Sequence, residues 1–152
     1  YMDDPGRIQH FLKVHGFAKV IGEEENLDEL QQFILEAAAI THDIGIKASE
    51  QKYGSCAGHY QELEGPPIAR DMLNGLGGEP EIVERICYLI GHHHTYDKID
   101  GIDYQILIEA DFLVNADEEG MDLETIRAAK ERIFKTEAGK SLIDKNFLKR
   151  EH

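Results

Sequence analysis

The nine residues AAAITHDIG at positions 37–45 say most about how this chain folds. The alanines and isoleucine continue an apolar helical pattern, and glycine is the residue most often found just past a helix end. We therefore expect a buried helix that stops at Gly45. His42 lies one turn after Ala38 on the apolar face, and Asp43 follows directly. An imidazole and a carboxylate thus stand together at a helix end, where unsatisfied carbonyl groups favour a cation.

The same helical spacing extends along the chain on both sides of this stretch. Either Asn26 or Asp28 is expected to cap this helix, and Pro66 with Pro67 is expected to open a later one. Residues 48–64 show no periodicity and carry glycines, which predicts a loop with at most a short helical piece. No segment alternates with a period of two for long enough to be a strand, so the fold class is all-α. The other expected helices span about 7–25, 66–78, 80–94, 103–117, 123–134 and 138–148.

The composition is that of a globular protein, and we expect a single domain over residues 1–152. The hydrophobic fraction is 41% and the charged fraction 30%. A formal net charge of −14 argues against polymeric nucleic acid and an anionic membrane surface as partners. No apolar run is long enough to cross a bilayer, and the N-terminus lacks a signal-peptide pattern. Two cysteines, Cys56 and Cys87, are too few for a disulfide framework and predict a reducing, cytoplasmic location.

Several polar side chains stand where the helix pattern requires apolar ones, and a buried charge or imidazole needs a partner. The His-Asp pair described above is one case, and His10 on the inward stripe of the first helix is another. Asp111, within ILIEADFLV, is neither a helix cap nor a solvated charge. It requires a cation, a network of donors or a raised pKa. Continuing the apolar stripe of the 80–94 helix also turns His93 or His94 inward.

Each of these residues also has a purely structural interpretation. His10 could be a core histidine bonded to a backbone carbonyl, and the His-Asp pair could be a polar helix end. The histidines at 92–94 could be a solvated helix end that the helix dipole favours. Taken together, however, the four positions can converge at one end of a helical bundle, as in helical metal sites. A His and Asp set without thiolates suits Mn, Fe, Co, Ni or Mg, so we expect a divalent ion.

The histidine in RIQH, the His-Asp pair in THDIG and the aspartate in EADFL occur in an order and context that resemble the HD-domain superfamily of metal-dependent phosphohydrolases. The resemblance covers about residues 7–115, and the helical segments expected within 122–150 lie beyond it. It implies a helical HD-type domain with a metal site among its central helices. The ligands that it implies are His10, His42, Asp43 and Asp111.

Family members with two metals carry further histidines between the His-Asp pair and the last Asp. The later of these is matched by His93 or His94. At the earlier position the nearest residue is Glu64, just before Gly65, and His59 lies five residues upstream as a second candidate. The resemblance thus leaves both one and two ions open.

The activity implied by the resemblance is hydrolysis of a phosphate ester of a small metabolite, with a nucleotide as leading candidate, through a metal-activated water. Asp43 is expected to orient or help deprotonate this water, or to bridge two ions. Arg7 shares a helix side with His10, and Lys47 follows Gly45 closely, so these two cations are the expected catalytic and substrate-binding ones. Arg70 is the third candidate for the substrate, although an ordinary surface charge is its simpler interpretation.

Two other functions fit the same residues. One is a non-catalytic signalling module that binds a metal and a nucleotide without turnover, and the other is a di-iron oxygenase of the same fold. The pattern leaves the oligomeric state open. Glu118 and Glu119 are expected to form a solvated helix end. Tyr53, Tyr60 and Tyr96 are expected in loops near the mouth of the site, where packing is a simpler role than stacking on a base.

Overall fold

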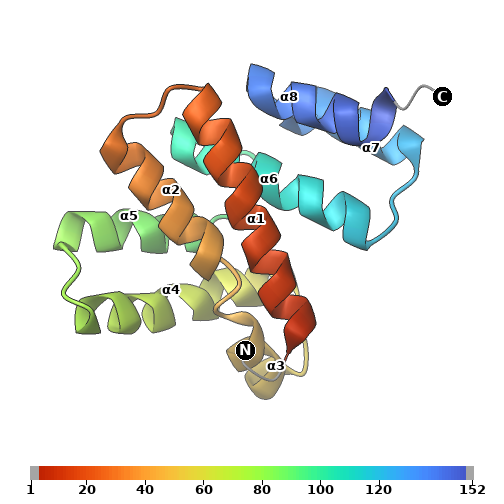
Figure 1. Ribbon diagram of the computed structural model, residues 1–152. Coiled ribbons are helices and arrows are strands. Elements are labelled where there is room, and N and C mark those ends of the chain that lie inside the picture. Colours follow the sequence, from red (N-terminus) through yellow and green to blue (C-terminus); the bar gives the residue numbers. More distant parts are fainter. Residues whose placement is uncertain (1–3, 150–152) are drawn as a thin grey trace.

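The computed structural model describes residues 4–149, and within that range it contains helices and no strand, which confirms the all-α prediction. Figure 1 shows their arrangement. In chain order the elements are α1 (Pro5–Glu24), α2 (Glu29–Thr41), α3 (Ile46–Tyr53), α4 (Gly58–Gly75), α5 (Pro80–Ile90), α6 (Ile102–Glu118), α7 (Leu123–Ile133), α8 (Glu137–Ile143) and the short π-helical segment η1 (Asp144–Leu148).

Side-chain caps define where several of these helices begin. Asp4 accepts a hydrogen bond from the Arg7 backbone at the start of α1. Asp28 and Gln31 form a reciprocal capping box at the start of α2, so Asp28 is the cap of this helix. Asn26, the other candidate, has a positive φ of 60° and lies in the turn before it. The cap position therefore follows from the glutamine three residues downstream.

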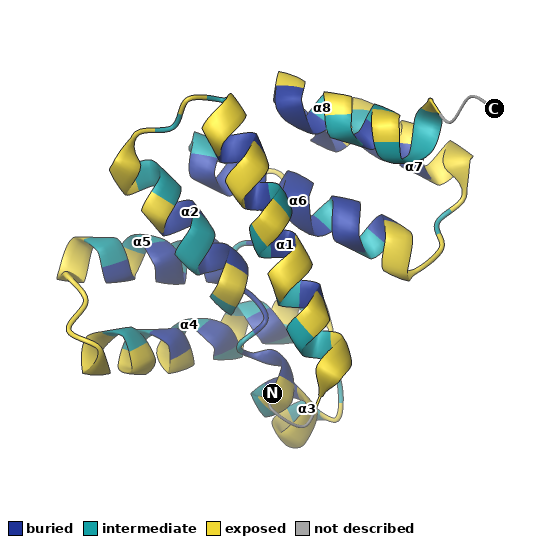
Figure 2. Cartoon of the chain, in the orientation of Figure 1, coloured by how far each residue is buried: buried dark blue, intermediate teal, exposed yellow. Residues whose placement is uncertain are grey.

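Helix α6 lies at the centre of the fold. It packs against α1 and α2 on one side and against α7 and α8 on another, while α4 and α5 pair with each other. Figure 2 shows dark blue, buried residues along most of α6, whereas α1 is buried along one stripe only. A polar side chain on α6 is thus enclosed by neighbouring helices and must find its partners there.

The helix that was expected to stop at Gly45 ends earlier, at Thr41. Residues 42–45 form a turn, and Gly45 stands at the start of α3. A Cβ atom on Gly45 would lie 2.7 Å from the backbone nitrogen of Gly65 in α4. The glycine is therefore required for the close approach of this turn to α4.

The prediction of a loop over 48–64 is wrong. Helix α3 and the first two turns of α4 occupy this stretch, and the break between them is short and contains Gly54 with a φ of 67°. Pro66 and Pro67 lie inside α4 instead of opening it. The early turns of α4 are fixed by tertiary packing, because Gln61 and Gly65 are buried and Gly65 packs against the α2–α3 turn.

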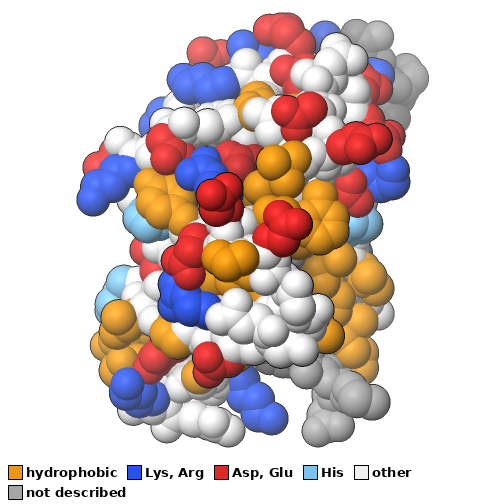
Figure 3. All heavy atoms as spheres, turned by 90° about the vertical axis from the view of Figure 1, so that its left-hand side faces the viewer, with side chains coloured by type: hydrophobic (Ala, Val, Ile, Leu, Met, Phe, Trp, Pro, Cys, Tyr) orange, Lys and Arg blue, Asp and Glu red, His pale blue; other side chains and the backbone are white. Residues whose placement is uncertain are grey.

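The C-terminal elements cover α6. Ile126, Ile133, Phe134 and Ile143 are all buried in the same core as the α6 side chains. In the described part of the chain, no helix combines the length and the apolarity that crossing a membrane requires. Figure 3 shows acidic side chains spread over one face of the molecule, in keeping with the net charge of −14.

Candidate metal centre

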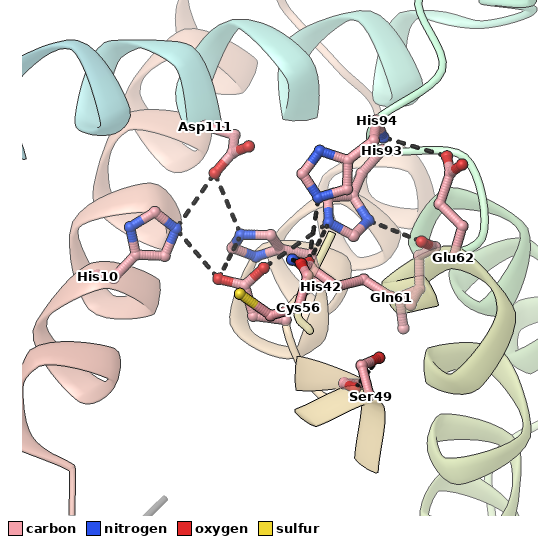
Figure 4. A network of polar contacts seen from close by, with 12 residues as sticks. His10, His42, Ser49, Cys56, Gln61, Glu62, His93, His94 and Asp111 are labelled. Atoms are coloured by element: carbon pink, nitrogen blue, oxygen red, sulfur yellow. Dashed lines mark hydrogen bonds and ion pairs between the residues drawn. The ribbon is translucent and has the colours of Figure 1, made fainter. Parts of the chain in front are cut away.

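Three segments of the chain bring two imidazoles and two carboxylates together. His10 comes from the second turn of α1, His42 and Asp43 from the turn after α2, and Asp111 from the middle of α6; all four are buried. The Nε2 atom of His10 lies 3.2 Å from Asp43 Oδ2 and 3.2 Å from Asp111 Oδ1. The Nε2 atom of His42 lies 3.3 Å and 3.2 Å from the same two oxygens. Figure 4 shows how His10, His42 and Asp111 point toward one another.

The state of His42 indicates what this cluster is built to hold. Its Nδ1 donates to the carbonyl oxygen of Ala39 at 2.7 Å, which places the ring proton of the neutral imidazole on Nδ1. Its Nε2 is buried, has no hydrogen-bond partner and faces two carboxylate oxygens. A lone pair that faces anionic oxygens in a buried site is unfavourable unless a proton on Nε2 or a metal ion supplies positive charge among them.

The donor set fits a divalent metal ion. His10, His42 and Asp43 each offer a ligand atom, and these atoms lie within 4.8 Å of one another. Imidazole nitrogens with carboxylate oxygens suit Mn, Fe, Co or Ni. The residues present therefore match the ion that the sequence pattern implies.

The pKa values of the cluster also indicate a need for positive charge among the carboxylates. Burial lowers the pKa of His10, but hydrogen bonds with Asp111, Asp43 and Glu118 outweigh it and raise this pKa to about 10. Burial likewise lowers the pKa of His42. The charge of Asp43, the hydrogen bond that a protonated Nε2 would donate to Asp111, and the charge of Asp111 raise this pKa to about 9. The carboxyl pKa values of Asp43 and Asp111 are raised by burial, yet the neighbouring imidazoles hold both below their usual range. In the absence of a metal, protons on the histidines supply the positive charge that the carboxylates require.

A second group of polar side chains adjoins the first through Asp43. His93 Nδ1 bonds the carbonyl oxygen of Ile90 at 2.7 Å, and its Nε2 lies 3.7 Å from Asp43 Oδ1. Gln61 Oε1 lies 3.3 Å from Nε2 of His93 and 3.1 Å from Nε2 of His94. Burial and the charge of His93 lower the pKa of His94 to about 4, so His94 is neutral.

Gln61 was missed by sequence reasoning. Its signal was its position four residues before buried Gly65, which puts both residues on one face of α4. Gln61 and Gly65 share a face only because residues 58–65 are helical, which the sequence pattern does not predict. The amide nitrogen of Gln61 donates to the carbonyl oxygen of Cys56, which turns its oxygen toward the histidines.

Glu64 and His59, the earlier candidates for a second metal, lie apart from the cluster. Glu64 pairs with Lys52 Nζ at 2.9 Å and accepts a hydrogen bond from the Tyr53 hydroxyl at 3.2 Å. His59 is exposed, and its ring lies against that of Tyr60 with centroids 4.0 Å apart. The helical phase of α4 places Gln61 and not Glu64 toward the centre.

The three predicted cations have different positions. Arg7 Nη1 lies 3.5 Å from Asp43 Oδ2, and its side chain is 37% exposed. Lys47 and Asp43 line one cavity of about 350 Å³ beside the cluster. Arg70 forms an ion pair with Glu84 across the exposed surface of α4 and α5, at 2.8 Å. The structure thus places Arg7 in contact with the cluster and Lys47 on a cavity that Asp43 also lines, and it leaves Arg70 at the surface.

The tyrosines expected near the mouth of the site and the glutamates expected at a solvated helix end also differ in their surroundings. Tyr53 and Tyr60 stack on each other with ring centroids 4.1 Å apart, so they pack together. Tyr96 follows α5 and is partly exposed. Glu118 and Glu119 are exposed at the end of α6, as expected, but Glu118 also reaches inward, because its Oε1 lies 2.5 Å from His10 Nδ1.

Comparison with known protein families agrees with this geometry. A family model described as the HD domain matches residues 7–135, so the chain belongs to the HD-domain family. This family is of the metal-dependent hydrolase type, and a divalent metal site at the buried cluster is consistent with it. No significant match is found among curated proteins or among solved structures.

Proposed function

We propose that this protein is a metal-dependent phosphohydrolase that cleaves a phosphate ester of a small metabolite, with nucleotides as the first substrates to test. The observation that supports this most directly is the buried His42 Nε2, which faces Asp43 and Asp111 without a hydrogen-bond partner. Such an arrangement favours a divalent ion. The ion would lower the pKa of a coordinated water and polarise the phosphoryl oxygens of a substrate.

The buried residues would hold and orient the reacting groups. His10 and His42 would bind the ion as neutral imidazoles through Nε2. Asp43 has one oxygen among these two nitrogens and another directed at His93. It would therefore help to hold the ion with Oδ2 and orient the attacking water with Oδ1.

Two cations would receive the phosphate. Arg7 contacts Asp43 at the long distance of 3.5 Å and is partly exposed, so its guanidinium can turn toward a phosphate oxygen. Lys47 shares a cavity with Asp43 and adds a second positive charge. A chain with a net charge of −14 repels anions in general, and these groups with the ion would reverse the field locally.

The test combines metal content with turnover. Elemental mass spectrometry of the purified protein is expected to find a near-stoichiometric divalent metal, which the Asp43→Ala variant loses. The protein loaded with Mn²⁺ is expected to release phosphate from one or more members of a panel of nucleotides and sugar phosphates, and the variant is not.

Other outcomes would favour the alternative functions. Binding of metal and nucleotide without phosphate release would contradict the phosphohydrolase and support a binding module. Two irons per chain with oxygen-dependent turnover would support an oxygenase. Absence of metal after soaking with each ion would overturn the site itself.

A further inference from the structure

The three buried histidines near Asp43 are oriented in two different ways. The Nδ1 atoms of His42 and His93 each bond a carbonyl oxygen three residues earlier in the chain, at 2.7 Å in both cases. Both histidines stand just past a helix end, where the carbonyl groups of the last turn lack a helical partner. Their orientation is thus provided by the backbone itself.

His10 cannot be oriented in this way. It lies in the second turn of α1, where the neighbouring carbonyl oxygens accept hydrogen bonds within the helix. Its Nδ1 instead lies 2.5 Å from Oε1 of Glu118, the last residue of α6. The orientation of His10 therefore depends on a side chain that substitution can remove.

Helix α6 contacts both nitrogens of the His10 ring. Asp111 and Glu118 are seven residues apart, two helical turns, and so lie on one face of α6. Asp111 Oδ1 is 3.2 Å from Nε2, and Glu118 Oε1 is 2.5 Å from Nδ1. The first contact lies on the side of the ring that faces the cluster, and the second lies on the opposite side.

The position of Glu118 at the end of α6 does not explain why a carboxylate is found there. The C-terminal end of a helix carries partial negative charge, which disfavours a carboxylate there. The Glu118 side chain is 30% exposed and still reaches a histidine that is only 4% exposed. The contact with His10 offsets this unfavourable position.

We infer that Glu118 is a positioning residue of the metal centre: it accepts the Nδ1 proton of His10, presents Nε2 to the ion, and adds a negative charge behind this ligand. Hydrogen-bond acceptors behind metal-binding histidines fix the tautomer and increase ligand basicity, and their loss weakens metal binding about 10–100-fold. The inference rests on the proposed function only through the metal centre.

The experiment compares two substitutions of Glu118 with a matched control. Glu118→Gln keeps an acceptor of the same shape and removes the charge, whereas Glu118→Ala removes both. Glu119→Gln makes the same change of charge one residue further along, at an exposed position. Affinity for Mn²⁺ alone is measured by calorimetry, together with the visible spectrum of Co²⁺-loaded protein and the unfolding temperature of metal-free protein.

Glu118→Gln is expected to weaken Mn²⁺ binding about tenfold and Glu118→Ala up to about 100-fold, with an altered Co²⁺ spectrum. Glu119→Gln is expected to bind like the parent. Parent-like Mn²⁺ affinity in both Glu118 variants would overturn the inference, even if their unfolding temperature fell. So would an equal loss in Glu119→Gln, because only the general charge would then matter.

These outcomes are separable from those of the proposed function. Weakened binding in the Glu118 variants of a protein without phosphate release would support the inference and contradict the phosphohydrolase. Phosphate release with unchanged Mn²⁺ affinity would do the reverse. A parent protein that binds no divalent ion would overturn both.

Discussion

Glu109 and Asp111 are two buried acids, two residues apart on α6, with opposite surroundings. Glu109 Oε2 accepts hydrogen bonds from the Gln105 amide and from the backbone of Lys135 and Thr136. Its Oε1 accepts from the Thr136 hydroxyl at 2.6 Å. Asp111 Oδ1, on a different side of the helix, faces the Nε2 atoms of His10 and His42. One carboxylate is surrounded by protein donors, and the other lies among potential metal ligands.

The difference shows that burial of an acid does not by itself identify a functional site. The Glu109 oxygens are satisfied by the segment that leads into α8, so this side chain holds the C-terminal helices on α6. A Cβ atom on Gly139 would lie 1.9 Å from Glu109 Oε1, which shows how closely α8 approaches it. Asp111 faces a buried nitrogen that has no hydrogen-bond partner, His42 Nε2, and this marks the cluster as the candidate metal centre.

The largest effect on folding is expected from Glu109→Ala. The change removes the acceptor of the Lys135 and Thr136 backbone N–H groups and of the Thr136 hydroxyl, and the Gln105 amide keeps only its bond to the Ile133 carbonyl oxygen. Each unsatisfied buried polar group costs about 1–3 kcal/mol. We expect the free energy of unfolding to fall by about 3–5 kcal/mol, measured by urea denaturation of the metal-free protein. A variant as stable as the parent would contradict a structural role for Glu109.

Asp111→Asn is expected to reduce metal affinity strongly and the free energy of unfolding only slightly. Asp111 is a proposed direct ligand, and its loss should weaken Mn²⁺ binding by more than the roughly 100-fold that follows loss of an outer partner. The free energy of unfolding without metal should fall much less than in Glu109→Ala, because His10 and His42 can release their protons when the carboxylate charge is removed. Calorimetry and urea denaturation of both variants test this contrast, and a metal affinity equal to that of the parent would contradict it.

The metal-free protein is expected to lose stability at alkaline pH. The pKa values of His10 and His42 rise from 6.5 to about 10 and about 9 on folding, so their contribution is complete below pH 6.5 and is lost as the pH rises through these values. The lowered pKa values of Asp43 and Asp111 contribute above their ordinary value of 3.8 and are lost in acid. Stability should therefore be greatest between about pH 4 and 6.5.

Urea denaturation in the presence of a chelator at pH 5.5, 7.5 and 9.5 measures this dependence. The Asp111→Asn variant should show a weaker alkaline loss, whereas Glu109→Ala should keep the slope of the parent at lower stability. Stability that rises between pH 6.5 and 9 would contradict the assignment. A saturating divalent ion should shift the optimum to higher pH, because the ion displaces the histidine protons.

The smallest effects are expected from substitutions of the cationic side chains, and they concern kcat/KM. Arg7→Gln should lower kcat/KM about 10–100-fold, the effect of one charge-assisted hydrogen bond to a phosphate, with metal content unchanged. Arg70→Gln is the control, because Arg70 is engaged with Glu84 at the surface, and its kcat/KM should equal that of the parent. Steady-state kinetics on the best substrate distinguishes the two, and equal losses in both variants would contradict a specific role for Arg7.

Local sequence determined the helices and the positions of the central polar residues. The apolar spacing of three and four residues predicted α1, α2, α5 and α6, and His10 and Asp111 stood out because they interrupt that spacing. The His-Asp pair stood out at the end of an alanine-rich helix. These features depend on residues within one or two turns, which is the range over which a helix is specified.

Contacts between distant segments decided the early turns of α4 and the partners of the buried polar side chains. The early turns of α4 form where Gly65 packs on Gly45, and this placed Gln61 beside the histidines. His10 is 108 residues from Glu118, and Glu109 is 27 residues from Thr136. Whether a buried polar atom is satisfied depends on the donors and acceptors that neighbouring helices bring to it. For that reason only the tertiary structure separates the carboxylate that holds the fold together from the one that faces the histidines of the candidate metal centre.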